Sequence, residues 1–374
     1  MAVIGGGPAG LQASITGAKQ GLNITLFEKH KIGENIKCAE GFFDSMKMFG
    51  EPKYGVKFKV NSLVIEAKEK YDLDCRNINL WMIDRSEWQV GLKNEAISKG
   101  VEVKEDFPVK SEDLNELSCA YDYVIDCSGI PSVTSIARGF SDEYRENWAH
   151  AYQVTLAGDF QNMIGQIRVG VDPNYFGYYW IFPKTKSIAN VGLGVFPQNR
   201  KYYGNVQTNL KKELHKLLQC EELKNCKVIG SGGGVIPTKP VSNLIHDNII
   251  LAGDSGGFSS PLHGGGIDLA MLTAEQAVKA VTEENLQNYY LNIEQMVKQK
   301  LDIEYKITSL WAQLGYEHLD RLLKVILRKE AITELPKLFK FKDLLFSERD
   351  TISAFFDGFF YGQWYDKQKE FKTK

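Results

Sequence analysis

The sequence predicts an α/β fold in which a largely parallel sheet carries an inserted antiparallel sheet and is followed by a C-terminal helical region. Three observations predict this fold. A short apolar strand near the N-terminus runs into a glycine-rich turn and a helix, and a second strand, glycine-rich turn and helix follow near residue 250. Segments of alternating polarity lie between these two units, which is typical of antiparallel strands.

Composition limits the classes of function. The chain has 374 residues, enough for two or three packed units, and its formal net charge of -2 gives no basic field, so nucleic acid is not an expected partner. No apolar run is long enough to cross a bilayer. The six cysteines show no C-x-x-C spacing, so we expect no metal site and a cytoplasmic protein with reduced thiols.

The first element is the strand Ala2-Val3-Ile4, which leads into the run Gly5-Gly6-Gly7-Pro8-Ala9-Gly10 and a helix. This run satisfies G-x-G-x-x-G in its required strand-to-helix context. The first glycine makes a tight turn, the second lets a pyrophosphate approach the backbone, and the third lets the helix pack close to the strand. The free N–H groups at the helix N-terminus then face the phosphates. The expected dinucleotide contacts here are Gly5, Gly7, Pro8, Ala9 and Gly10.

A second strand, Ile24–Phe27, ends at an acidic residue, Glu28. An acid at this point accepts hydrogen bonds from the ribose hydroxyls of a bound adenosine. We assign Glu28 and the adjacent Lys29 to the dinucleotide site. The ordered strand, glycines, helix, strand and terminal acid predict a Rossmann-like unit.

The second glycine-rich unit distinguishes FAD from NAD. The strand 248–252 leads into Gly253-Asp254, and a second turn, Gly264-Gly265-Gly266-Ile267, opens a helix to about Ala280. This region resembles the superfamily of FAD-dependent hydroxylases and reductases. The resemblance implies that Gly253 and Asp254 contact FAD, with Asp254 on the flavin ribitol, and that the backbone N–H groups of 264–267 lie near the flavin pyrimidine ring. The alternative for Asp254 is a helix cap or turn residue.

Two middle segments add to this resemblance. Ile83-Asp84-Arg85 opens a helix to about Ser98 and looks like the superfamily's D-R motif, which implies that Arg85 faces the cofactor and Asp84 caps the helix. The strand Tyr123–Ile125 leads to Gly129, similar to the turn that passes the adenine. The predicted cofactor is FAD.

Further motifs resemble the geranylgeranyl reductase family. Lys37-Cys38-Ala39-Glu40-Gly41 is similar to its K-x-C-G-E-G-like loop, with Ala39 in place of the more usual glycine, and 190–194 is similar to its N-V-G-x-G strand. The run 178–183 reads Y-x-W-x-F-P, and 233–237 resembles the family's G-G-x-I-P turn. These landmarks span residues 5 to about 280.

Several residues are candidates for chemistry. Cys38 is a candidate proton donor or positioning residue, because its thiol is mostly protonated at neutral pH; a small packing residue is the alternative. Tyr178, Trp180 and Phe182 alternate along one strand, share a face and, with Pro183, can wall a substrate channel, although core packing gives the same pattern. His263, next to the glycine turn, is a second candidate acid, or a hydrogen-bonded spacer.

The resemblance implies an FAD-dependent reductase that saturates the carbon–carbon double bonds of a polyprenyl lipid by hydride transfer from the reduced flavin N5. NAD(P)H or a ferredoxin would be the electron donor. Two alternatives remain open: a flavin-dependent monooxygenase or halogenase on the same fold, and a flavin electron-transfer protein.

The predicted FAD-binding domain is discontinuous, with segments 1–49, 84–145 and 240–280. Segments 50–83 and 146–239 form the predicted antiparallel-sheet substrate domain, and 281–374 the C-terminal helical region. The stretch 355–365 concentrates seven aromatic residues. It is either a lid or subunit contact packed on the main body, or a peripheral membrane surface for lipid entry.

Overall fold

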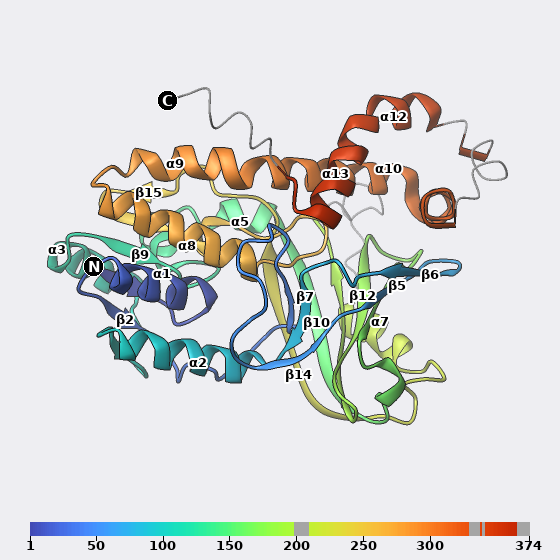
Figure 1. Cartoon of the computed structure of the whole chain (residues 1–374), viewed down its shortest axis with the longest axis horizontal. Helices are drawn as coiled ribbons and strands as arrows, with labels where there is room; N and C mark the ends of the chain where they lie inside the picture. Colours follow the sequence, from blue (N-terminus) through green and yellow to red (C-terminus); the bar gives the residue numbers. More distant parts are fainter. Residues whose placement is uncertain (198–208, 329–336, 339–340, 365–374) are drawn as a thin grey trace.

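The computed structural model describes residues 1–197, 209–328, 337–338 and 341–364. Its α/β architecture, with a parallel sheet, an inserted sheet and a helical C-terminal part, confirms the predicted fold class (Figure 1). The predicted substrate domain includes residues 198–208, and the predicted C-terminal region includes 329–336, 339–340 and 365–374, all of which lie outside the described residues.

The N-terminal part is built on a parallel sheet. Within the described residues its strand order is β15-β16-β9-β1-β2-β8, and every neighbouring pair is parallel except β15 and β16. The four central strands are short and fully buried, as expected where helices cover both faces. The strands are β1 (Ala2–Ile4), β2 (Thr25–Phe27), β8 (Glu102–Lys104), β9 (Val124–Asp126), β15 (Ile245–His246) and β16 (Ile249–Leu251).

Helices pack around this sheet, and α1 packs against both α2 and α8. Asp84 caps α2 by accepting hydrogen bonds from the backbone N–H groups of Ser86 and Glu87, which confirms its predicted capping role. The helices of this part are α1 (Pro8–Lys19), α2 (Arg85–Ser98), α3 (Leu114–Ala120), α4 (Val133–Arg138), α5 (Asp142–Glu146) and α8 (Ile267–Thr282).

The inserted sheet differs in three ways from the predicted one. In the described ranges its strand order is β14-β10-β13-β12-β11-β5-β6, and β5 pairs with β11 in parallel, so the sheet is not entirely antiparallel. The strands β4 and β7, from the same predicted segment 50–83, instead join β3 in a separate small sheet. The predicted turn at 233–237 is wrong, because these residues pair with β10 as part of the long strand β14.

The strands of the two sheets follow the chain in order. Alternating apolar residues of the larger sheet, including Val154, Leu156, Val191 and Leu193, form a core under α7 (Leu210–Leu217). The strands are β3 (Gly41–Phe43), β4 (Val56–Lys59), β5 (Ser62–Glu66), β6 (Lys70–Asp74), β7 (Leu80–Ile83), β10 (Trp148–Ala157), β11 (Gln166–Gly170), β12 (Gly177–Thr185), β13 (Ile188–Val195) and β14 (Lys227–Pro237).

The C-terminal helices lie along one side of both sheets, coloured orange to red in Figure 1. They are α9 (Gln287–Ile293), α10 (Gln299–Arg328), α12 (Lys342–Ser347) and α13 (Arg349–Tyr361), and α10 bends at Gly315, whose φ is 67°. No described helix combines the length and apolar character needed to span a bilayer.

The aromatic residues of α13 face the main body only in part. Phe359 packs on Phe43 with ring centroids 5.3 Å apart, and Trp364 is 1% exposed and donates to the Ser45 carbonyl at 2.8 Å. Tyr361, by contrast, is 64% exposed. Tyr365, the last residue of the predicted aromatic stretch, lies outside the described residues.

Candidate functional site

The glycines of the first turn have different surroundings. A Cβ at Gly10 would stand 1.8 Å from the Gly5 carbonyl oxygen, and Gly5 itself has a φ of 100°. A Cβ at Gly7 would meet no atom within 4 Å. Thus Gly5 and Gly10 are required for the backbone crossing, whereas Gly7, the N-cap of α1, borders open space. No side chain caps α1, and its first turn has no acidic residue, so Pro8 and Ala9 begin a helix whose N-terminus can receive an anion.

Glu28 lies at the end of β2 beside this turn. One carboxylate oxygen accepts a hydrogen bond from the Gly6 N–H at 2.6 Å, and the other accepts from the His30 N–H at 3.0 Å. These contacts fix the carboxylate next to the loop where the sequence predicts a ribose. Lys29 is exposed to solvent.

The turn after β9 is tied to the turn after β16. The Gly129 N–H donates to the Ser255 hydroxyl at 3.0 Å, and that hydroxyl lies 3.2 Å from the Gly129 carbonyl. Fully buried Asp126 accepts hydrogen bonds from Ser128 and Thr134, which shapes the turn from below. Sequence reasoning missed Asp126 and Ser255, although each adjoins a predicted site residue.

Asp254 and Arg85 face each other electrostatically across the site. The Asp254 carboxylate makes no hydrogen bond to any described residue, whereas the Arg85 guanidinium donates to Gln89 at 2.5 Å and keeps a buried Nε without a partner. Burial raises the pKa of Asp254 to about 6, and the positive charge of Arg85 offsets part of that rise. Gly253, which precedes Asp254, has a φ of 64° and lies against Ala9.

This pKa predicts how the stability of the apoprotein depends on pH. The native pKa of Asp254 lies above the value of 3.8 for a free Asp, so the native state binds more protons between about pH 4 and 6. We therefore expect the free energy of unfolding to fall as pH rises through that window, by no more than about 3 kcal/mol. Urea denaturation at several pH values measures it. The Asp254→Asn variant should lose this fall; if its profile matches the parent's, Asp254 is not the group responsible.

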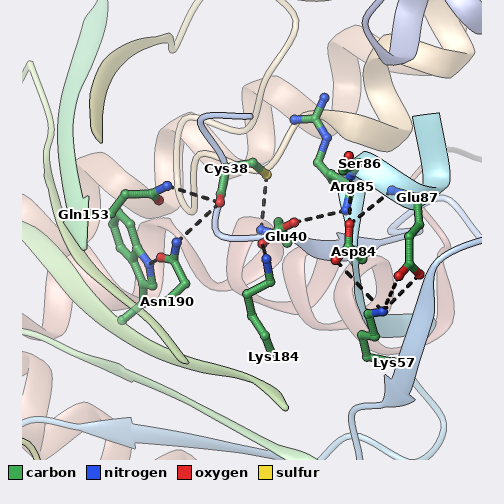
Figure 2. A network of polar contacts seen from close by, with 11 residues as sticks. Cys38, Glu40, Lys57, Asp84, Arg85, Ser86, Glu87, Gln153, Lys184 and Asn190 are labelled. Atoms are coloured by element: carbon green, nitrogen blue, oxygen red, sulfur yellow. Dashed lines mark hydrogen bonds and ion pairs between the residues drawn. The ribbon is translucent and has the colours of Figure 1, made fainter. Parts of the chain in front are cut away.

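The loop with Cys38 is anchored by the inserted sheet (Figure 2). The Cys38 carbonyl accepts from the side-chain amides of Gln153 at 3.3 Å and Asn190 at 3.5 Å. The Cys38 Sγ accepts from the Glu40 N–H at 3.2 Å. The sulfur is thus held as an acceptor, and its own hydrogen stays available for transfer.

Glu40 connects this loop to α2 and to β12. It is buried at a φ of 68°, its carboxylate pairs with Lys184, and it accepts from the Arg85 backbone N–H at 3.0 Å. Figure 2 shows these contacts side by side. Sequence reasoning recognised Glu40 only as a letter of the loop motif, and the motif gave no sign of its partner Lys184.

The aromatic residues of β12 contact both loops. The Tyr178 hydroxyl donates to the His263 carbonyl at 2.5 Å, and the Trp180 indole N–H donates to Asn190, the residue that holds Cys38, at 2.7 Å. Phe182 lies 3.5 Å from the position a Cβ would take at Gly41, and Pro183 is buried beside it in sequence. One strand therefore joins the Cys38 loop to the His263 loop.

The second glycine turn is closed by its own hydrogen bonds. The Gly264 N–H donates to the Ser260 carbonyl at 2.9 Å, and the Ser260 N–H donates to Gly265 at 2.8 Å. Gly266 is the N-cap of α8, and Ile267 is its buried first residue. The Gly265 N–H donates to the His263 Nδ1 at 3.1 Å.

These features fit FAD. The open space at Gly7, the uncapped N-terminus of α1, the unpaired Asp254 carboxylate and the unpaired Arg85 Nε are the groups that a pyrophosphate and a polyhydroxylated chain would satisfy. Residues 1–73 match the family model described as an FAD binding domain. The chain is an FAD-dependent oxidoreductase.

The inserted sheet narrows the class. Residues 148–236, from β10 to β14, match the model described as the geranylgeranyl reductase catalytic domain. The chain is 28% identical to the digeranylgeranylglycerophospholipid reductase of Methanocaldococcus jannaschii, over 92% of this chain and 97% of that protein. Identity to the enzyme of the same name from Methanosarcina acetivorans is 26%, over 92% of each. The chain is geranylgeranyl reductase-like.

Solved structures share the fold. A geranylgeranyl bacteriochlorophyll reductase-like protein from Thermoplasma acidophilum superposes with a TM-score of 0.76 at 20% identity, over 92% of this chain and 98% of that one. The halogenase PltM gives a TM-score of 0.65 at 12% identity, over 99% and 89%. The halogenase is a distant relative with the same fold.

Proposed function

We propose that this protein saturates carbon–carbon double bonds of a geranylgeranyl-type polyprenyl lipid. The observation that carries the proposal is the convergence of the Cys38 loop and the His263 loop on the aromatic face of β12. The names of the curated relatives, which are reductases of digeranylgeranylglycerophospholipid, support the same substrate class.

We propose that the predicted residues hold FAD in an extended pose. The Gly5–Gly10 turn would receive the pyrophosphate, Glu28 and Gly129 the adenosine side, Arg85, Gly253 and Asp254 the ribityl chain, and 264–267 the pyrimidine ring. The support is their placement along one continuous line of turns at the carboxyl ends of β1, β2, β9 and β16. The domain boundaries predicted from the sequence remain part of this proposal.

When bound and reduced, FAD supplies a hydride, and saturation of one double bond then needs one proton as well. We assign that proton to the Cys38 Sγ, whose hydrogen is not used in the contact with Glu40. Tyr178, Trp180 and Phe182 would exclude water and align the apolar chain, because an isolated alkene reacts only when it is held close in a dry site.

The electron donor and the route of the lipid are also proposals. We propose NAD(P)H or a ferredoxin as donor, since the second glycine run, 230–234, lies inside the strand β14 and not at a helix N-terminus. We propose that lipid enters from a membrane contacted peripherally near α12 and α13, where Phe346 is 69% exposed.

The direct test is anaerobic. Protein loaded with FAD is reduced with NADPH, NADH or reduced ferredoxin in turn and mixed with liposomes that contain a geranylgeranyl lipid. We expect lipid-dependent reoxidation, a product mass higher by about two per saturated bond, and co-sedimentation with the liposomes. Liposomes of fully saturated lipid are the control. Reoxidation that requires oxygen, or that is equal with both lipids, would contradict the reductase activity.

A further inference from the structure

Two buried charged residues of α10 lie directly behind the second glycine turn. Lys300 and Glu304 are each 1% exposed, and the Lys300 Nζ contacts the Glu304 Oε1 at 2.5 Å. The same Glu304 oxygen lies 3.5 Å from the His263 Nε2. The other oxygen, Oε2, is buried with no hydrogen-bond partner in the described part of the chain. A charged pair therefore ends at the His263 ring.

The contacts of His263 define its tautomer. Because Nδ1 accepts the Gly265 N–H, it carries no proton in this arrangement, and the proton of the neutral ring is on Nε2. Nε2 faces the carboxylate of Glu304. The His263 carbonyl accepts from Tyr178, and its ring lies against Phe43 with centroids 5.6 Å apart. Both ring nitrogens are thus directed at protein groups.

The surroundings keep Glu304 charged. Burial opposes its ionisation, but Lys300 and His263 outweigh burial and hold its pKa at about 2. Lys300 lies under the Trp364 ring, 4.9 Å from its centroid, and also acts on Asp268 in the first turn of α8. Asp268 is held by the Ser45 hydroxyl at 2.5 Å. Asp268, Lys300, Glu304 and His263 thus form one buried set of charges behind the turn.

A buried ion pair contributes little to stability compared with apolar residues of the same size, so its position needs another reason. We propose that Glu304, held by Lys300, is a positioning residue that fixes His263 as the Nε2–H tautomer. His263 Nδ1 then remains an acceptor for Gly265, and the 264–266 turn keeps the conformation that faces FAD. This inference rests on the proposed placement of FAD and gives His263 a positioning role, where the sequence suggested an acid.

The test uses FAD-loaded protein labelled with ¹⁵N in its histidine rings, with Nδ1 and Nε2 distinguished by NMR and His263 assigned from the His263→Gln variant. We expect His263 to carry its proton on Nε2 alone. In Glu304→Gln the amide can either accept or donate, so the Nδ1–H tautomer should appear as well. The dissociation constant of FAD, measured by flavin fluorescence, should rise about tenfold.

Two further variants make the outcome decisive. Glu304→Gln leaves Lys300 buried and unpaired, so Lys300→Met with Glu304→Gln keeps the site neutral if the single variant fails to fold. Asp320→Asn is the matched control, because Asp320 is a buried acid of α10 whose lysine, Lys324, also stands four residues later, and its hydroxyl partner is Tyr71.

We expect the control to leave the His263 tautomer and the FAD affinity unchanged. The inference is overturned if wild-type His263 carries its proton on Nδ1, if the neutral double variant keeps only Nε2–H, or if the control shifts both readouts equally. None of these measurements contains an alkene, so a failure of lipid reduction would leave their result intact.

Discussion

Gly10→Ala is expected to give a protein that retains almost no FAD. The new Cβ would stand 1.8 Å from the Gly5 carbonyl oxygen and 3.3 Å from a Val3 methyl, so either α1 or the turn must move. Overpacking of this kind costs about 1–3 kcal/mol or more, and the displaced helix N-terminus no longer meets the phosphates. The yellow absorbance per mole of purified protein and the melting temperature measure the two effects.

Gly7→Ala is the matched control for this prediction. A Cβ at Gly7 meets no protein atom, and the residue has a φ of -80°, which alanine adopts freely. We expect the melting temperature of the apoprotein to be unchanged, while FAD binds at least about tenfold more weakly because the methyl occupies the space of the pyrophosphate. Unchanged FAD affinity in Gly7→Ala would remove the pyrophosphate from this turn.

Cys38→Ala is expected to reduce alkene turnover by about 10²-fold or more with FAD content unchanged. The size follows from the usual contribution of a positioned general acid. The carbonyl contacts to Gln153 and Asn190 involve the backbone and survive the substitution, so the loop stays in place. Single-turnover reoxidation under anaerobic conditions separates this step from lipid release.

Cys119→Ala provides the control, since Cys119 is an exposed cysteine of α3. It should turn over at the wild-type rate. Cys38→Ser, which keeps a transferable proton, should recover part of the lost rate. Should Cys38→Ala and Cys38→Ser both match the wild type, Cys38 is a packing residue and the proton comes from elsewhere.

Local patterns were sufficient for the parallel half of the fold. The strand Ala2–Ile4, the helix starting at Pro8 and the helix starting at Arg85 with its cap at Asp84 were all expected from neighbouring residues. The glycine run at 230–234 was harder. Its family motif suggested a turn, but pairing with β10 draws it into a strand, and such pairing depends on residues some eighty positions away.

The sequence by itself determined the class of cofactor, because glycines and a terminal acid at fixed spacing have few other uses. Tertiary structure alone decided what stands behind those motifs. Lys184 reaches Glu40 and Glu304 reaches His263 only once separate sheets and helices have packed. A buried charge takes its role from its partner, and partners distant along the chain leave no periodic trace in sequence.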